Sequence, residues 1–234
     1  MGDVQAAFVT AFLLIINFDA KLAEIVWLSL RVSLTAVLLA SLMGLPLGAI
    51  LALSRFPGHR FAVVLLNALM GLPPVVVGLL VYLLLSRSGP LGTWGLLFTP
   101  TAMIIAQCIL VLPIVAALTR QVVEDLWEEL EEQLCSLGAS PRQAMWTLLW
   151  EGRFSLLTAV LAGLGRSIAE VGAVMIVGGN IAHVTRTMTT AIALETSKGD
   201  LPLALGLGII LITLAVLINI ALYLVQDIAR RVQA

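Results

Sequence analysis

The chain has 234 residues, of which 60% are hydrophobic and 12% charged, with a formal net charge of −1 and a mean hydropathy of +1.07. Soluble domains carry about 25% charged residues, so this composition excludes a soluble globular enzyme, a disordered protein and a basic nucleic-acid-binding protein. Two cysteines, Cys108 and Cys135, are too few for a disulfide framework or a four-cysteine zinc site. The composition predicts a polytopic membrane protein.

The first apolar stretch runs from Val4 to Phe18, which is short of the roughly 20 residues that cross a bilayer as a helix. No basic residue precedes it as in a signal peptide. We predict that residues 1–22 form an interfacial segment, with an additional span as the alternative, and that residues 23–234 form a single transmembrane domain.

Five further segments are long and almost free of charge. They are continuously apolar without strand-like alternation, which favours an all-α membrane protein over a β-barrel. Each is long enough to cross about 30 Å of hydrocarbon as a helix. We predict spanning helices near residues 27–54, 61–86, 100–119, 154–177 and 201–226.

Glycine and proline cluster within the first two of these predicted spans. Glycine permits close helix packing in lipid, and proline removes a backbone donor and can kink a helix. Tight packing and a gating role both remain open for these residues, which are Gly44, Pro46 and Gly48, followed by Gly71, Pro73, Pro74 and Gly78.

The distribution of lysine and arginine predicts the orientation of the chain. With five spans, one side collects more basic residues than the other, and two pairs, Arg55 with Arg60 and Arg230 with Arg231, lie directly beside the ends of spans. Basic residues near span ends favour the cytoplasm. We therefore predict an external N-terminus and a cytoplasmic C-terminus.

The polar segment 120–153 lies between the third and fourth predicted spans. Apolar residues recur at helical spacing up to Leu134, which predicts an amphipathic continuation of the third helix. Gly138 can then end that helix, Ser140 can cap a second helix over 142–150, and Pro141 suits its first turn. We predict a rigid helical knob whose apolar side, with Ala144, Met145, Leu148 and Leu149, docks into a partner.

This segment resembles the cytoplasmic coupling loop of ATP-binding cassette (ABC) importer permeases. Glu132 and Gly138 have the spacing of the family pattern, and Leu148 occupies its isoleucine position. Gln133 and Leu134 replace the two alanines of the pattern, while Trp150 and Glu151 replace its final Leu-Pro. The stretch 166–181 is similar to oxyanion permeases for sulfate, molybdate and tungstate, and 185–200 resembles the tungstate branch.

The resemblance implies a type I importer that imports tungstate, with molybdate or sulfate as alternatives. It implies a bacterial or archaeal inner-membrane assembly of two copies of this chain, two cytoplasmic ATPases and an extracytoplasmic oxyanion-binding protein. This chain would then be a transport subunit that binds no cofactor, with ATP and magnesium held by the partner. The ATPase-coupling residues implied are Glu132, Leu137, Gly138, Ala139, Ser140 and Arg142.

Two charged residues lie deep in the fourth predicted span. Arg166 and Glu170 are four residues apart, so they share one helix face and can pair. Either Arg166 assists passage of a divalent oxyanion, or the pair has a structural role. Ionisable residues within membrane spans serve each of these roles in membrane proteins. The structural alternative predicts similar losses when either residue is replaced with alanine.

Polar residues follow the same predicted span on its outer side. Gly178, Gly179 and Asn180 can expose backbone N–H groups to an anion or simply end the helix. Hydroxyls between Thr185 and Thr190 are predicted on the outer surface, where a binding protein would dock, with coordination of the anion as the alternative. His59 and His183 are isolated, which argues against a metal site.

Two functions of other classes remain as rivals. An intramembrane enzyme would need facing catalytic groups, but Glu170 is the only carboxylate deep in a predicted span. A proton- or sodium-coupled secondary transporter could use Glu170 as its relay. The sequence has no glycine-rich phosphate loop followed by Lys-Ser/Thr, so ATP would have to be hydrolysed by a partner.

Overall fold

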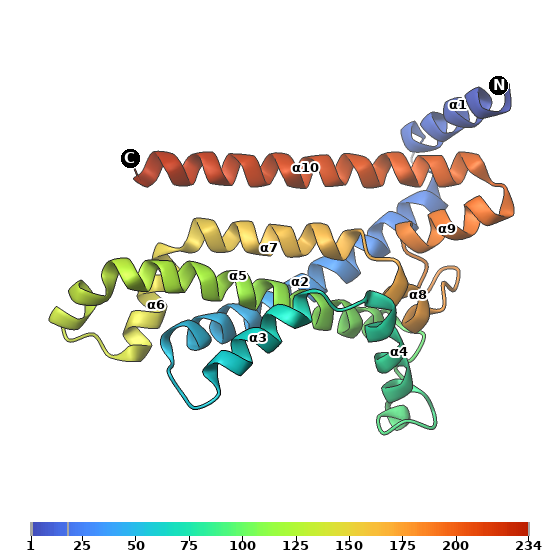
Figure 1. Ribbon diagram of the computed structural model, residues 1–234. Helices are drawn as coiled ribbons and strands as arrows, with labels where there is room; N and C mark the ends of the chain where they lie inside the picture. The colour runs from blue at the N-terminus through green and yellow to red at the C-terminus, as the bar shows by residue number, and fades with distance from the viewer. Residues whose placement is uncertain (1, 18, 234) are drawn as a thin grey trace. The chain divides into compact units, whose positions relative to one another are not determined.

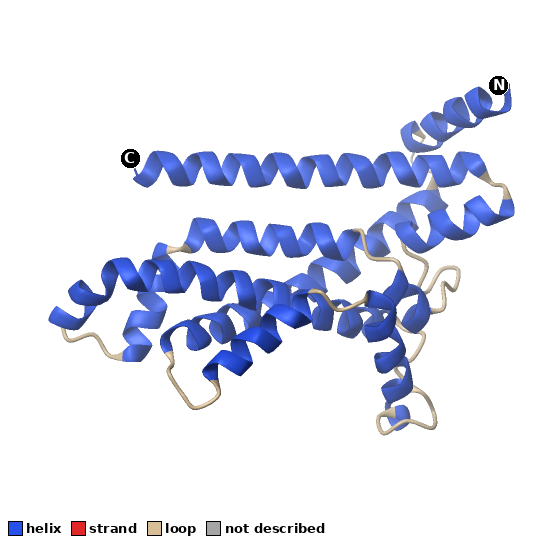
Figure 2. Ribbon diagram, in the orientation of Figure 1, coloured by secondary structure: helices blue, strands red, loops and turns tan. Residues whose placement is uncertain are grey.

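A computed structural model describes residues 2–17 and 19–233, and its described residues form helices and loops without a strand (Figure 2). Side chains of residues 1–5, 18 and 228–234 lie outside this description, and with them those of Arg230 and Arg231. The elements, labelled in Figure 1, are α1 (Gly2–Ile16), α2 (Ala20–Leu53), α3 (His59–Met70), α4 (Pro74–Leu85), the 3-10 turn η1 (Gly92–Trp94), α5 (Pro100–Ser136), α6 (Pro141–Glu151), α7 (Arg153–Ile168), α8 (Gly172–Gly178), α9 (Met188–Lys198) and α10 (Leu201–Gln233).

Three helices in the described part of the chain are long and apolar enough to cross a membrane. They are α2, α5 and residues Leu201–Asp227 of α10. The number rises to as many as five if α3 with α4, and α6 with α7, each count as one broken span. The all-α membrane fold predicted from the sequence is therefore confirmed.

Two predicted spans are not single helices. The segment 61–86 is divided into α3 and α4, because a residue before proline is held out of the helical region and Pro73 accordingly has ψ 121° before Pro74. The segment 154–177 is divided into α7 and α8, which end and begin on either side of residues 169–171. The first break falls at the prolines that were expected to permit a kink, and α3 with α4 can still count as one broken span; the break after Ile168 was not predicted.

The chain divides into two compact units. Unit 1 comprises Met1–Ala36, Pro73–Gln107 and Gly165–Ile218, and unit 2 comprises Val37–Leu72, Cys108–Leu164 and Asn219–Ala234. Long helices contribute residues to both.

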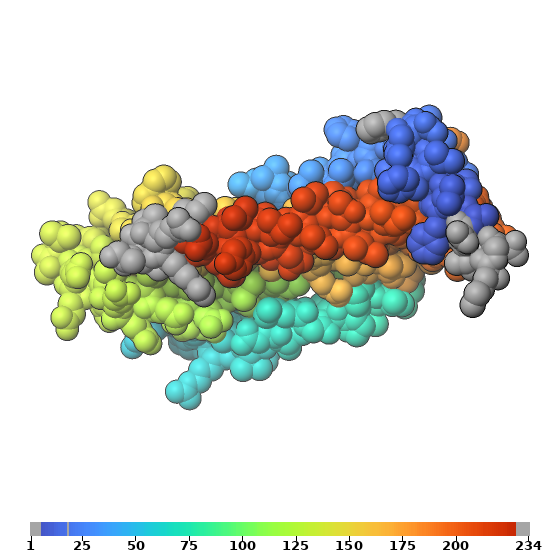
Figure 3. All heavy atoms as spheres, turned by 90° about the horizontal axis from the view of Figure 1, so that it is seen from above, coloured from blue at the N-terminus to red at the C-terminus, as the bar shows by residue number. Residues whose placement is uncertain are grey.

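In unit 1, α4 packs directly against α8 (Figure 1). The approach is close enough that a Cβ on Gly78 would lie 2.8 Å from the Cα of Ala173. Helix α1 lies beside the first turns of α10 (Figure 3), where the position of a Cβ on Gly206 is 3.7 Å from the carbonyl oxygen of Ala11. The predicted 4–18 segment is therefore helical up to Ile16, and its apolar part, Ala6–Ile16, is a short helix.

In unit 2, α2, α5 and α7 share an apolar core. Val37 and Ala40 of α2 pack with Val111 and Val115 of α5, and Val160 of α7 joins the same cluster. Small residues allow α2 and α5 to approach closely. For Gly44 and Gly48 this arrangement favours the packing role over the gating role. Pro46 lies inside the continuous helix α2.

Gly48 offers a direct test of this packing. A Cβ there would lie 2.7 Å from the Thr119 Cβ and 3.0 Å from the Arg120 backbone nitrogen. We predict that Gly48→Ala lowers the free energy of unfolding by about 1–3 kcal/mol, measured by denaturation of the purified chain in detergent. Gly208→Ala is the matched control, because Gly208 is also helical and has open space around its Cβ position. Equal stability of the two variants would contradict close α2–α5 packing.

Candidate functional site

The α5–α6 connection in unit 2 forms the turn that the sequence predicts. Gly138 has φ +70°, and the Ala139 N–H donates to the Leu134 carbonyl at 3.0 Å while the Gly138 N–H donates to that of Cys135 at 3.0 Å. These two bonds make a Schellman motif, which satisfies carbonyls that the end of α5 would otherwise leave unpaired. Glycine is favoured here because left-handed φ values disfavour a Cβ.

The following helix is capped by Ser140 and has Pro141 as its first residue, as predicted. The Gln143 backbone N–H donates to the Ser140 hydroxyl at 3.4 Å, and the Ser140 backbone N–H donates to Gln143 Oε1 at 2.9 Å. This capping box, with Pro141 in the first turn, fixes the direction in which α6 leaves the turn.

The apolar side of α6 that was predicted to dock into a partner is already used inside unit 2. Leu148 is fully buried and clusters with Ala49 of α2 and Val123 of α5, and Met145 packs against the same cluster. That prediction was wrong because the long α5 supplies a facing apolar stripe within the same chain. Within the turn and α6, the large apolar residues that are exposed are Leu137, Trp146 and Trp150.

The sequence-predicted coupling residues gather around this turn. Glu132, Leu137, Gly138, Ser140 and Arg142 are exposed, and Ala139 is half-buried. Leu137 is 82% exposed. The turn is thus a rigid, exposed tip that is anchored through Leu148.

In unit 1, Glu170 is the centre of a buried polar cluster. Its side chain is 4% exposed, and its Oε2 lies 3.7 Å from Nη2 of Arg166. Glu170 Oε1 accepts a hydrogen bond from the Ala173 backbone N–H at 3.2 Å, and the Thr189 hydroxyl donates to the Glu170 carbonyl at 2.8 Å. The carboxylate therefore caps the start of α8 as well as facing Arg166.

The two members of the predicted pair are unequal. The Arg166 side chain is 43% exposed, whereas that of Glu170 is almost fully buried. They do not share a face of one helix, because α7 ends at Ile168 and Glu170 lies in the break before α8. The predicted contact exists, but it joins a helix end to a capping residue.

The outer turn Gly178–Asn180 ends α8 in the left-handed conformation. Gly179 has φ +69° and Asn180 has φ +51°. The Thr185 hydroxyl donates to the Gly178 carbonyl at 2.6 Å and accepts from the Ile181 N–H at 2.9 Å. These contacts use the polar backbone groups of the turn internally, which favours the helix-stop alternative.

The predicted surface hydroxyl cluster lies in the interior of the described chain. Thr185, Thr187, Thr189 and Thr190 are all buried, because they cap α9 and hold the ends of α8. Thr187 and Thr190 form a capping box at the start of α9. The prediction that these hydroxyls form an outer docking surface was wrong.

Sequence reasoning missed a second buried ion-pair group in unit 1. Arg186 Nη1 lies 3.5 Å from Glu195 Oε1, and Lys198 Nζ lies 3.2 Å from the same oxygen. Glu195 is 4% exposed and Arg186 is 14% exposed. The available signal was local, because Glu195 and Lys198 are three residues apart on a helix. The contact with Arg186 depends on the turn that precedes α9.

Comparison with known proteins shows which family the chain resembles. Residues 44–232 match the family described as binding-protein-dependent transport system inner membrane component. The chain is 41% identical to the tungstate uptake system permease protein TupB of Peptoclostridium acidaminophilum over 97% of this chain and 100% of the relative. It is also 41% identical to TupB of Campylobacter jejuni, over 91% and 89% of the two chains.

More distant matches extend the comparison. The sulfate transport system permease protein CysW of Synechocystis is 32% identical over 86% of this chain and 74% of the relative. Among solved structures, a chain of the MetNI methionine ABC transporter in an inward-facing conformation aligns with a TM-score of 0.75, covering 92% of this chain and 98% of that one. Its 20% identity shows the fold alone.

Proposed function

The chain belongs to the inner membrane component family of binding-protein-dependent transport systems, and from this premise we propose that it is the permease subunit of an ATP-driven importer for tungstate. The single observation that carries the substrate is the 41% identity to a tungstate uptake permease along that relative's whole length. Membership of this family makes the chain a transport subunit and not an enzyme, with ATP hydrolysis on a separate subunit. Sulfate or molybdate is the alternative, favoured by the 32% identity to a sulfate permease.

Two copies of the chain would form the transport pathway. One copy supplies only three to five candidate spans, which are few to enclose a gated pathway, and twofold symmetry is the commonest closed arrangement of identical chains. The N-terminus lies outside and the C-terminus lies in the cytoplasm, as the basic residues Arg55 and Arg60 beside the end of α2 support. A separate extracytoplasmic binding protein delivers the anion.

The α5–α6 turn is the contact with the ATPase. Its tip is exposed at Leu137, while Leu148 fixes α6 to α2 and α5 within unit 2. A push or pull on the tip therefore moves α6 as a rigid lever together with the helices of that unit, since packed cores shift between discrete arrangements instead of deforming continuously. Access alternates between the two faces of the membrane as these helices tilt.

Arg166 is the residue of the buried charge cluster that can face a passing oxyanion. Its side chain is 43% exposed and its one carboxylate contact spans 3.7 Å, so guanidinium donors stay available. Transport requires a contact weak enough to release the anion again. An exposed arginine with one long carboxylate contact meets that requirement better than a buried and unpaired one.

Uptake of radiolabelled tungstate tests the proposal. Cells that carry the gene together with those of its ATPase and binding protein should take up tungstate at a rate at least about tenfold above that of cells lacking this gene. Unlabelled tungstate should compete, with sulfate and molybdate weaker at equal concentration. Preferential competition by sulfate would assign the alternative substrate, and uptake that persists without the ATPase but collapses with the proton gradient would indicate a secondary transporter.

A further inference from the structure

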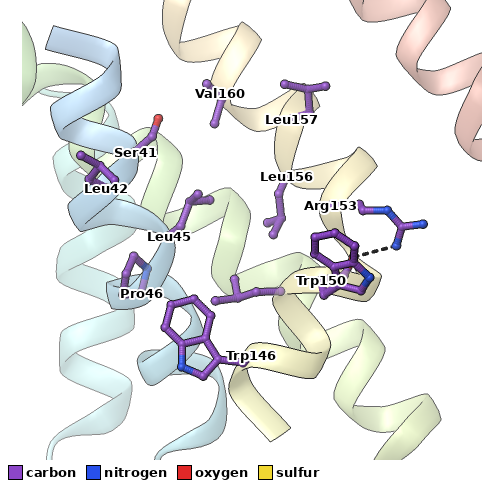
Figure 4. Close-up of a pocket in the computed structure, with 11 residues that line it drawn as sticks. Ser41, Leu42, Leu45, Pro46, Trp146, Trp150, Arg153, Leu156, Leu157 and Val160 are labelled. Atoms are coloured by element: carbon purple, nitrogen blue, oxygen red, sulfur yellow. Dashed lines mark hydrogen bonds between the residues drawn. The ribbon is translucent and has the colours of Figure 1, made fainter. Parts of the chain in front are cut away.

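An open apolar groove of about 470 Å³ lies in unit 2 between α2, α6 and α7 (Figure 4). Leu42 and Pro46 of α2 form one wall, and Leu157 of α7 forms the other. Leu42 is 64% exposed, so one wall of the groove opens away from the protein. In an inner membrane component, such an opening faces hydrocarbon or another protein.

The end of the groove near α6 has a different chemistry. Trp146 and Trp150, which are 57% and 71% exposed, lie there with Arg153 (Figure 4). The Arg153 guanidinium lies 5.2 Å from the centre of the Trp150 ring and 4.8 Å from that of Phe154. Tryptophan gathers where hydrocarbon meets the polar headgroups of a bilayer, so this end has the composition of a membrane surface.

Arg153 retains charge and donors for a ligand. Its Nη1 donates to the Trp150 carbonyl at 2.8 Å, which uses one of five N–H groups. Among the side chains that the structure describes, which are those of residues 6–17 and 19–227, no ion pair includes Arg153. The residue also begins α7, so the positive end of that helix dipole adds to the same field.

We propose that this groove binds an anionic phospholipid, with an acyl chain between α2 and α7 and the phosphate against Arg153. Apolar walls suit an acyl chain and disfavour a soluble anion. Arg153 has no carboxylate partner among the described side chains, and such a cation suits the phosphate. A zwitterionic lipid would carry its own ammonium beside Arg153 and bind more weakly. This site is separate from the α5–α6 tip and goes beyond the proposed transport function.

Quenching by phospholipids with brominated acyl chains tests the site in the chain purified with its ATPase. The chain has five tryptophans, so the signal of Trp146 and Trp150 is obtained by subtracting that of the double variant Trp146→Phe/Trp150→Phe. Brominated phosphatidylglycerol should quench these two at lower concentration than brominated phosphatidylcholine. Arg153→Gln should weaken phosphatidylglycerol binding about tenfold, whereas Arg60→Gln, which removes an exposed arginine of the same unit outside the groove, should leave it unchanged.

Any one of four results would overturn the proposal. Equal affinity for the two lipids, or unchanged affinity in Arg153→Gln, would contradict the proposed contact between the phosphate and Arg153. Full displacement of the lipid by glycerol phosphate would show that the occupant is a soluble anion. Absence of quenching at both tryptophans would show that protein covers the groove, and cross-linking from Leu157→Cys in a Cys135→Ser background would identify whether the ATPase or a second copy does so.

Discussion

Replacing Glu170 with alanine should lower the free energy of unfolding by about 3 kcal/mol, because hydrogen bonds to charged groups contribute roughly 1.5–3 kcal/mol and the vacated space adds a cavity term. The carboxylate is 4% exposed and supplies the acceptor for the Ala173 N–H at the start of α8. Removing it leaves that donor unpaired inside unit 1. Denaturation of the detergent-purified chain measures the change, and uptake should fall with the amount of folded protein.

The variants Glu170→Gln and Arg166→Ala separate the two roles of the carboxylate. Glutamine keeps an oxygen for the Ala173 N–H, so Glu170→Gln should recover most of the lost stability. Arg166→Ala should cost less than Glu170→Ala, because its contact with the carboxylate spans 3.7 Å and the Arg166 side chain is 43% exposed, while the Ala173 N–H still donates to the carboxylate. The similar losses expected from the sequence are thus replaced by unequal ones, and equal destabilisation by both alanine variants would restore the simple-pair explanation.

Substituting Gly138 with arginine should abolish uptake while leaving the abundance of the chain nearly unchanged. A Cβ at Gly138 meets no atom within 4 Å, so an arginine side chain projects from the tip without a clash inside the chain. Its backbone cost is limited to the left-handed φ of +70°, about 1–2 kcal/mol. The bulky cation would instead obstruct the proposed ATPase contact, which copurification of the ATPase measures directly.

Two control variants distinguish the effect of backbone strain from the effect of obstructing the docking surface. Gly58 also has positive φ and open space around its Cβ position, but it lies between α2 and α3, so Gly58→Arg should retain the ATPase. Gly138→Asn should retain it too, because asparagine tolerates this conformation. If Gly138→Asn and Gly138→Arg lose transport equally, the turn conformation and not the exposed surface is what matters.

Local sequence signals predicted the α5–α6 turn in detail. Gly138, Ser140 and Pro141 each act on backbone groups no more than a few residues away, through a left-handed residue, a cap and a preset φ. Such interactions are readable from spacing alone. Which side of α6 stays exposed was not readable, because Leu148 is buried by residues from α2 and from the far part of α5.

The break between α7 and α8 shows why other predictions failed. No proline stands at residues 169–171, and the local sequence reads as one apolar helix. After α7 ends at Ile168, a side chain takes the place of a helical backbone donor. The Thr189 hydroxyl donates to the carbonyl of Glu170, 19 residues earlier. Likewise Gln107 exchanges two hydrogen bonds with Ser167, 60 residues away. Contacts at such separations leave no periodic signature.

The sequence by itself determined that this protein lies in a membrane, that it is helical, and that a tight turn joins α5 to α6. These follow from composition and from interactions within a few residues, which hold wherever the segment lies. Only the tertiary structure decided that the hydroxyls from Thr185 to Thr190 are buried, that Glu170 caps α8 while Arg166 stays exposed, and that Trp146, Trp150 and Arg153 share one groove. The reason is that burial and polar pairing depend on which distant segments meet, and in a uniformly apolar chain many such meetings are compatible with the same hydrophobic pattern.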